Sequence, residues 1–361
     1  MHSAIVIPCL NEEHVIISTC TSLGFGVGAG TASSETFLIL VDNGSQDGTS
    51  QKMEEVKSRS PPGTVCTVVE PERGYVPARH RGVLEARNIA RAKGIPEQDF
   101  LILQADADTQ YSSGYVRAMR AAATGRRNFL LEGISDPWSG FDQTYSGYRA
   151  LSERVDAPLR KLFVEDAHDV IVSDNIAGYL LSDYFAWGGH RREFNRRGDE
   201  IFAETSRLFI KAKICGARKL KVIRAVGHHS RRKILQRPVL HFATAGFPRE
   251  QSWNSVWTKV FADYDHLGVF ADPALEHKLE QAIFLRQAHS LLIFGLIPEY
   301  VALLLGELGS GDSPPRFKDL IPFLHGVAKE ELACNTGPLF ENAFSIIDAH
   351  REVFGRYLEG I

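Results

Sequence analysis

The sequence predicts an α/β fold, with a mostly parallel sheet flanked by helices and followed by an α-helical extension. Two observations carry this prediction. Four short apolar runs alternate with helical patterns over the first third of the chain. These runs end at Pro8, Asp42, Glu70 and Asp106. Because ligands of parallel sheets bind outside the carboxyl ends of the strands, we expect these residues to lie at one site.

Strands and helices are expected to alternate from the first residues onward. Residues 4–7 form the first expected strand, which Pro8 ends, and Asn11-Glu12-Glu13 opens a helical segment that reaches about Leu23. The later strands are expected at 37–41, 65–69 and 220–225, with one that runs from Phe100 to Asp106, and a further helix at about 78–92. The runs are almost continuously apolar, as in strands buried on both faces.

Composition excludes several classes of protein. The chain has 361 residues, 44% of them hydrophobic and 24% charged, which is typical of a well-cored globular protein. Its 41 basic and 44 acidic residues give a net charge of −3, so no nucleic-acid partner is expected. The five cysteines show no C-x-x-C spacing, which favours reduced thiols in a cytoplasmic protein. No signal peptide is expected, since the first strand begins almost at Met1.

The fourth strand, which begins at Phe100, ends in Asp106-Ala107-Asp108. Two acids at this spacing are also typical of a solvated loop. Because three earlier strands end in polar residues at the same sheet edge, we favour a buried strand that delivers two carboxylates to a site.

The helix at about 78–92 begins with two cations, Arg79 and Arg81. Cations near the positive end of a helix oppose its dipole, which is explained more easily if an anion binds nearby. The alternative is that both arginines point to water, and for Arg81 we favour that alternative.

Four motifs resemble those of the family 2 glycosyltransferases, which have the nucleotide-sugar-binding GT-A fold. In chain order they are residues 5–13, residues 41–49, Gly74 with Ala78-Arg79, and Asp106-Ala107-Asp108. Their order and spacing make the resemblance specific over the first third of the chain, and a weaker similarity continues to about His229.

The resemblance implies a UDP- or GDP-sugar as donor. Asp108 would hold Mg²⁺ or Mn²⁺, and Asp106 would contact the ribose or the metal's water shell. The remaining implied donor-site residues are Pro8, Leu10, Asn11, Glu12 and Asp42 toward the base and sugar, and Arg79 toward the nucleotide. This fits the chemistry, because a departing nucleoside diphosphate concentrates negative charge and hard cations bind carboxylate and phosphate oxygens.

The attacking hydroxyl needs a general base. The family places it in a Glu-Asp pair that opens a helix after a Gly-Gly turn, and here Glu204-Thr205 aligns after Gly188-Gly189. Since the second acid is Thr205, Glu204 is the expected base. Asp199 and Glu200 are the alternatives, because Glu200 would share a helical face with Glu204 at (i, i+4). All three acids could also belong to a solvated helix face.

Two histidines and two arginines follow the strand at 220–225. The resemblance implies that His228 or His229 completes the metal's shell beside Asp108, and we favour His229. Arg231 and Arg232 could neutralise diphosphate oxygens. The alternative is a surface histidine pair beside basic residues.

The second half of the chain is helical in pattern. Helices are expected at about 251–264, 275–308 with a break at Pro298, 317–333 and 338–357. No acid, histidine or glycine constellation appears there. We therefore expect a catalytic domain at 1–232 and a helical region at 233–361 that covers the acceptor side of the site or forms a homodimer contact.

The sequence indicates less about the acceptor and the location of the protein. The acceptor is left open between a saccharide, a small molecule and a lipid-linked molecule, and inversion is implied by the resemblance alone. The apolar run at 290–308 contains Pro298 and Glu299, so we expect core helices and not a membrane span. Contact with a membrane surface, at its cytoplasmic face, stays open.

Three other functions each require sequence features of their own. A sugar-phosphate nucleotidyltransferase would need a glycine- and lysine-rich loop after the first strand, and Pro8-Cys9-Leu10-Asn11 does not supply one. A processive polysaccharide synthase would need membrane spans and a Q-x-x-R-W signature. A non-catalytic nucleotide-sugar-binding relative is favoured by Thr205 and disfavoured by the intact pair of Asp106 and Asp108.

Overall fold

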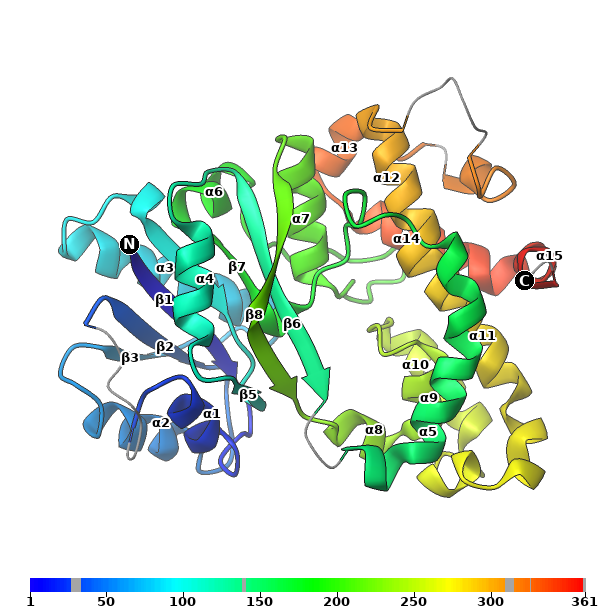
Figure 1. Cartoon of the computed structure of the whole chain (residues 1–361), viewed down its shortest axis with the longest axis horizontal. Helices are drawn as coiled ribbons and strands as arrows, with labels where there is room; N and C mark the ends of the chain where they lie inside the picture. Colours follow the sequence, from blue (N-terminus) through cyan, green and yellow to red (C-terminus); the bar gives the residue numbers. More distant parts are fainter. Residues whose placement is uncertain (27–33, 138–140, 309–314, 325, 360–361) are drawn as a thin grey trace. The chain divides into compact units, whose positions relative to one another are not determined.

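The computed structural model describes residues 1–26, 34–137, 141–308, 315–324 and 326–359. Its chain forms two compact units whose segments alternate along the sequence (Figure 1). One unit, the sheet unit, comprises residues 1–138, 172–192 and 204–230. The other, the helical unit, comprises residues 139–171, 193–203 and 231–361. The expected functional division at residue 232 stays a prediction.

The sheet unit contains one eight-stranded sheet within the described residues, in the order β3-β2-β1-β4-β7-β6-β8-β5. The strands are β1 (His2–Cys9), β2 (Thr36–Asp42), β3 (Val65–Val69), β4 (Phe100–Gln104), β5 (Thr109–Tyr111), β6 (Phe129–Pro137), β7 (Ala177–Leu180) and β8 (Arg218–His229). The α/β class is confirmed. The four strands of the first third, β3, β2, β1 and β4, run parallel to one another. Beyond β4 the sheet is mixed, because β7 runs antiparallel to both β4 and β6 and β5 runs antiparallel to β8. This arrangement is compatible with a GT-A fold.

Helices flank this sheet. They are α1 (Ile16–Ser22), α2 (Thr49–Ser58), α3 (Tyr75–Ala92), α4 (Tyr115–Ala123), α6 (Leu181–Ala186) and α7 (Glu204–Ile214), with short 3₁₀ turns η1 (Glu97–Asp99) and η3 (Asp174–Ile176). Every residue of β2 and β4 is buried, which explains their continuous apolar runs. Gly82 on α3 lets that helix lie directly against Val6 and Val41.

Three expected boundaries in the sheet unit were wrong. Pro8 lies inside β1 and pairs with Val41. The β1–β4 ladder ends at Val6, so one side of β1 has no ladder hydrogen bond for Pro8 to remove. The first helix begins at Ile16 because Asn11 has a positive φ of 56° and turns the chain. The last strand extends to His229, since its end pairs with β5, so His228 and His229 lie within it.

The helical unit consists of short and medium helices. They are α5 (Phe141–Asp156), η2 (Ala157–Leu162), α8 (Arg232–Gln236), α9 (Pro238–Ala243), α10 (Gln251–Phe261), η4 (Leu267–Phe270), η5 (Pro273–Leu279), α11 (Glu280–Leu291), η6 (Leu292–Leu296), α12 (Ile297–Leu305), η7 (Ile321–Leu324), α13 (Lys329–Cys334), α14 (Gly337–Ala349) and α15 (Arg351–Glu359).

Three helical expectations were also wrong. Pro298 does not break the chain of helix, because the π-helical segment η6 precedes it and α12 continues beyond it. A π-helical turn changes the hydrogen-bonding pattern before Pro298, so the helix continues although proline has no backbone N–H to donate. The segment expected as one helix at 317–333 forms η7 and α13 instead, and the helix at 338–357 divides at His350.

One helical segment, Pro273–Leu305, is long and apolar enough to span a membrane by length and composition. Most of its apolar stretch is buried in the structure. Buried core helices share these properties, so the segment is weak evidence for a span.

Candidate functional site

The loops after β1 and β2 are joined by hydrogen bonds at the carboxyl edge of the sheet. The Asn11 N–H donates to Ser45 Oγ at 3.2 Å, and Asn11 Oδ1 accepts from the Gln46 N–H at 2.8 Å. The Glu12 N–H donates to Thr49 Oγ1 at 2.7 Å. Leu10, on the same loop, is exposed. The structure therefore brings Leu10, Asn11 and Glu12 next to the end of β2, as the motifs predicted.

Asp42 ends β2 and is held in place by its own loop. Its Oδ1 accepts from the Ser45 N–H at 2.9 Å and its Oδ2 from Ser50 Oγ at 2.6 Å. Burial raises the pKa of the Asp42 carboxyl, but these hydrogen bonds outweigh burial and lower the pKa overall. Asp42 is therefore an ionised group that can only accept hydrogen bonds near neutral pH.

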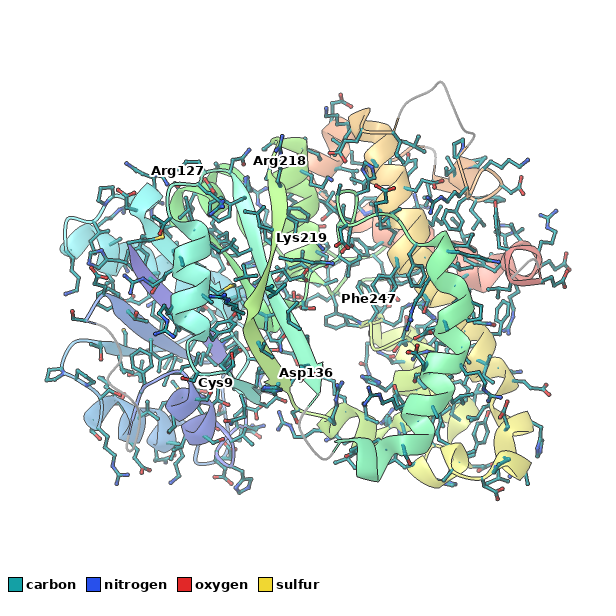
Figure 2. All side chains as sticks on the ribbon, viewed as in Figure 1. Cys9, Arg127, Asp136, Arg218, Lys219 and Phe247 are labelled. Atoms are coloured by element: carbon teal, nitrogen blue, oxygen red, sulfur yellow. The ribbon has the colours of Figure 1, made fainter. Side chains whose placement is uncertain are left out.

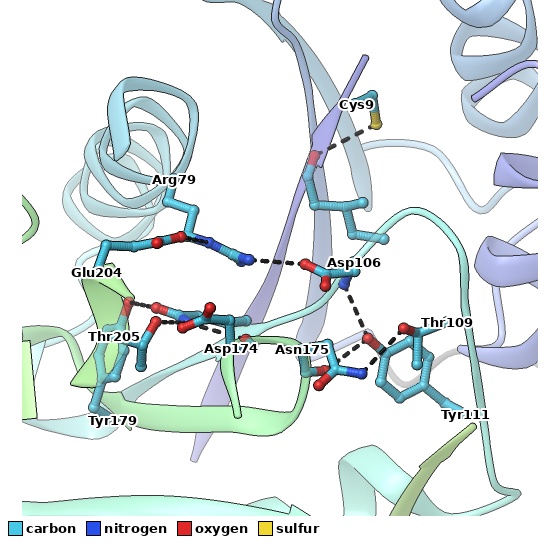
Figure 3. Close-up of polar contacts among 12 residues, drawn as sticks. Cys9, Arg79, Asp106, Thr109, Tyr111, Asp174, Asn175, Tyr179, Glu204 and Thr205 are labelled. Carbon is cyan, nitrogen blue, oxygen red and sulfur yellow. Dashed lines mark hydrogen bonds and ion pairs between the residues drawn. The ribbon is translucent and has the colours of Figure 1, made fainter. Parts of the chain in front are cut away.

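The acids after β4 are presented by a turn with alternating burial. Ala105, Ala107 and Thr109 are buried, whereas Asp106 and Asp108 are partly exposed. The Asp106 N–H donates to the Tyr111 hydroxyl at 3.1 Å, and that hydroxyl donates to the Asn175 carbonyl at 2.8 Å (Figure 3). The turn is thereby fixed with both carboxylates on its outer side.

Arg79, on the first turns of α3, joins two of the predicted site acids. Its Nε donates to Glu204 Oε1 at 2.9 Å and its Nη2 donates to Asp106 Oδ1 at 2.8 Å (Figure 3). The side chain is buried, and its Nη1 has no hydrogen-bond partner among the described residues. Burial alone would lower the pKa of the guanidinium, but the neighbouring carboxylates raise it. Arg79 therefore stays charged inside the protein.

Glu204 is the first residue of α7 and is 6% exposed. Its Oε1 accepts a hydrogen bond from Arg79 Nε. Next to it, Thr205 Oγ1 accepts from Gln104 Nε2 of β4 at 2.7 Å. The helix start is thus tied to the sheet, and the base assignment of Glu204 stays a prediction.

Asp174 was missed by sequence reasoning. It opens η3 immediately before β7, and its carbonyl accepts at 3.1 Å from Gln104 Nε2, the nitrogen that also donates to Thr205 Oγ1. Burial and the nearby charge of Glu204 raise the pKa of the Asp174 carboxyl, although Arg79 opposes the shift. The sequence held one signal, the polar Ser173-Asp174-Asn175 directly before a short apolar run. No strand was predicted there, so nothing placed Asp174 at the sheet.

Asp199 and Glu200 do not lie on the helix of Glu204, so the predicted (i, i+4) relationship was wrong. Ala203 has a left-handed φ of 60°, which ends any continuous helix there, and α7 begins only at Glu204. Both acids belong to the helical unit. Asp199 Oδ2 accepts from Ser252 Oγ at 2.6 Å, and hydrogen bonds of this kind lower its pKa. As bases, both stay predictions.

The predicted metal ligands come from paired strands. The β5–β8 ladder pairs Thr109 with His229. Asp108 directly precedes Thr109, so it adjoins the residue that pairs with His229. Ser135 Oγ lies 2.8 Å from His229 Nδ1. Asp136 lies near the end of β6 (Figure 2). Its Oδ2 is 3.6 Å from His228 Nδ1.

In the part of the chain that the structure describes, no three His, Cys, Asp or Glu residues cluster closely enough to hold a metal ion. Mg²⁺ and Mn²⁺ commonly take only one or two carboxylates together with phosphate oxygens and water. The metal role of Asp106, Asp108 and the histidines therefore stays a prediction.

Arg231 and Arg232 lie at the start of α8 in the helical unit. Their contact with a diphosphate stays a prediction.

Comparison with known proteins gives one family match. Residues 4–135 match the model described as glycosyl transferase family 2, and this segment contains all four motifs. A search of curated proteins found no significant relative of the chain.

Solved structures of similar shape share little sequence with the chain. S. aureus TarS 1–349 in complex with UDP-GlcNAc is 15% identical with a TM-score of 0.48, covering 100% of this chain and 92% of that chain. The mannosyltransferase PcManGT from Pyrobaculum calidifontis, in complex with GDP-Man and Mn²⁺, is 15% identical with a TM-score of 0.47, covering 97% and 87%. GalNAc-T7 with UDP, GalNAc and Mn²⁺ is 17% identical with a TM-score of 0.45, covering 63% and 43%.

Proposed function

Because residues 4–135 belong to glycosyl transferase family 2, we propose that the protein transfers a sugar from a UDP- or GDP-sugar to an acceptor hydroxyl, with inversion and with a divalent metal ion. The observation that carries this proposal is the meeting of the four matched motifs at one sheet edge. There Arg79 binds Asp106, and the loop of Asn11 and Glu12 binds the loop of Asp42.

Asp42 is proposed to bind the base of the nucleotide. An ionised carboxylate accepts hydrogen bonds and cannot donate them. Uracil and guanine both present ring N–H donors, so either suits this position. The backbone around Pro8 and Leu10, with Asn11 and Glu12, is proposed to line the same end of the donor.

Asp108, with Asp106 and His229, is proposed to hold Mg²⁺ or Mn²⁺, and His228 is the alternative imidazole. A bound metal would neutralise charge on the diphosphate as it leaves. Arg79 fixes the orientation of Asp106 through a charge-assisted hydrogen bond of 2.8 Å. Arg231 and Arg232 are proposed to meet the remaining phosphate charge.

A carboxylate must take the proton of the acceptor hydroxyl as it attacks the anomeric carbon. Glu204 is the residue that the family motif places there, with Asp199 and Glu200 as alternatives. The acceptor, a saccharide, a small molecule or a lipid-linked molecule, stays open. A cytoplasmic location, contact with the membrane surface and a homodimer also stay predictions.

The direct test is hydrolysis of a panel of UDP- and GDP-sugars by the purified protein, with Mn²⁺, Mg²⁺ or chelator, read as released nucleoside diphosphate. We expect release from one donor, its loss with chelator, and its loss in Asp108→Asn. Asp99→Asn is the matched control, because Asp99 pairs with Arg127 on the surface at 3.1 Å.

Two outcomes would decide against the proposal. Metal-dependent binding of UDP or GDP without turnover of any donor, even with acceptors of all three kinds, would favour a non-catalytic binding protein. Absence of both binding and turnover would contradict a nucleotide-sugar site altogether.

A further inference from the structure

The hydrogen bonds around Thr205 have a defined direction. Gln104 Nε2 donates to the Asp174 carbonyl at 3.1 Å and to Thr205 Oγ1 at 2.7 Å, while Gln104 Oε1 accepts from the Tyr179 hydroxyl at 2.8 Å. The carbonyl can only accept, so the amide nitrogen is correctly placed. Gln104 Nε2 therefore bridges the Asp174 backbone and the Thr205 side chain, which places the two residues next to each other (Figure 3).

Asp174 differs from the other carboxylates of this cluster. Glu204 and Asp106 are both bound by Arg79. Asp174 has no ion pair with Arg79, and its Oδ1 is buried without a hydrogen-bond partner among the described residues. The residue as a whole keeps some exposure. A buried oxygen without a partner lowers stability, so its presence calls for an explanation other than stability.

We propose that Asp174 is the general base of sugar transfer, supplying from the segment before β7 the carboxylate that α7 lacks at Thr205. This inference rests on the proposed function. In the step, Asp174 takes the proton of the acceptor hydroxyl, and the hydroxyl oxygen forms a bond to the anomeric carbon. The bond from that carbon to the phosphate oxygen breaks, and its electron pair leaves with the nucleoside diphosphate.

The electrostatics of the cluster support this role. The groups that face the Asp174 carboxyl are Arg79 on α3, Asp106 after β4, Tyr179 on β7 and Glu204 on α7. Burial and the charge of Glu204 outweigh Arg79 and raise the Asp174 pKa above its ordinary value, which increases the proton affinity of this carboxylate. Glu204, with Oε1 bound by Arg79, is less accessible for this step.

The first test is Asp174→Asn, measured on the donor that wild-type protein hydrolyses, with water as acceptor. We expect kcat to fall by about 10²–10⁴-fold, with the KM for donor nearly unchanged. The melting temperature should be unchanged or higher, because the substitution removes a buried charge. A structural role would instead lower the melting temperature and spare kcat.

Asp183→Asn is the matched control. Asp183 is also a buried aspartate of the sheet unit with a pKa raised by burial, and its Oδ2 accepts from the Asn128 N–H at 2.8 Å. It lies on α6 outside the cluster. We expect this variant to keep wild-type kcat.

Two further experiments separate a base from a positioning residue. Sodium azide attacks as an anion and has no proton to lose, so it should restore release of nucleoside diphosphate in Asp174→Asn. The exchange variant Asp174→Asn with Thr205→Asp returns a carboxylate to α7 and should regain at least about tenfold in kcat over the single variant. The exchange also carries the test if Asp174→Asn alone does not fold.

The outcomes distinguish this inference from the proposed function. Wild-type turnover with an unchanged kcat in Asp174→Asn would overturn the role of Asp174 and leave the glycosyltransferase standing. Loss of kcat that neither azide nor the exchange restores would also overturn it. Absence of wild-type turnover on every donor and acceptor would remove the proposed function itself.

Discussion

Arg79 Nε lies 2.9 Å from Glu204 Oε1, although the two residues are 125 positions apart in the sequence. The Arg79 side chain is 3% exposed and the Glu204 side chain 6%. Two charges removed from water in this way are stable only when their geometry is good and further polar partners are present. Asp106 supplies such a partner at 2.8 Å. The helix α3, the acid turn after β4 and the start of α7 are therefore held together by one guanidinium.

Replacing Arg79 with Met should destabilise the sheet unit strongly. Removing one partner of a buried ion pair leaves the other charge buried without compensation, which costs about 3–5 kcal/mol. Urea unfolding measures the free energy of unfolding. Arg87→Met is the control on the same helix, because Arg87 and Glu97 form a partly exposed pair and its loss should cost less than about 1 kcal/mol. Equal losses in the two variants would contradict the bridging role of Arg79.

The sequence predicted those features of the fold that depend on residues close together in the chain. The strand at 65–69 was predicted to the residue, and the fourth strand was predicted from Phe100 to Asp106 and ends at Gln104, because continuous apolar runs bounded by turn residues identify buried strands. The motif residues Asn11, Asp42 and Asp106 were placed at one edge because parallel strands align their carboxyl ends. These predictions required no knowledge of distant contacts.

The errors arose where distant or unusual backbone contacts decide. The role of Ala203 could not be read from the sequence, because a left-handed φ at a residue other than glycine is set by its surroundings. Asp174 was missed because Thr205, which Gln104 bridges to it, comes from a later helix, and the strand that follows Asp174, β7, has only four residues. The helix break predicted at Pro298 was wrong, because the π-helical segment η6 precedes this residue and the helix continues beyond it.

Substitution of Gly82 by Ala should destabilise the packing of α3 on the sheet. A Cβ at this position would lie 2.2 Å from Val6 Cγ1 and 3.1 Å from Val41 Cγ2, so β1 or α3 must shift. Overpacking of this kind costs about 1–3 kcal/mol, which exceeds the gain in helix propensity of about 1 kcal/mol. Thermal unfolding measures the change. Gly355→Ala on α15, where no atom lies within 4 Å of an added Cβ, should instead be neutral or stabilising.

The two histidines at the end of β8 should respond differently to substitution. His229 pairs in the ladder with Thr109, next to Asp108, whereas His228 Nδ1 lies 3.6 Å from Asp136 Oδ2. His229→Gln should therefore raise the Mn²⁺ concentration for half-maximal turnover by about tenfold or more. His228→Gln should leave it nearly unchanged. The reverse order would assign the metal to His228, and no change in either variant would remove histidine from the metal site.

His289 should make the helical unit sensitive to acid. Arg249 Nη1 lies 2.7 Å from His289 Nε2, and His289 Nδ1 lies 2.7 Å from the Leu285 carbonyl, so the proton of the neutral ring is on Nδ1. Burial and the charge of Arg249 lower its pKa from an ordinary 6.5 to about 3. Between these two values the unfolded chain binds the proton and the folded chain does not. Stability is therefore present above pH 6.5 and is lost as the pH falls toward 3, by about 1.4 kcal/mol per pH unit.

Urea unfolding at pH 7.5 and pH 5 measures this loss of stability. The loss should be smaller in His289→Gln than in wild type, whereas His277→Gln, at an exposed position, should match wild type. An equal pH dependence in His289→Gln and wild type would show that another group carries the acid sensitivity.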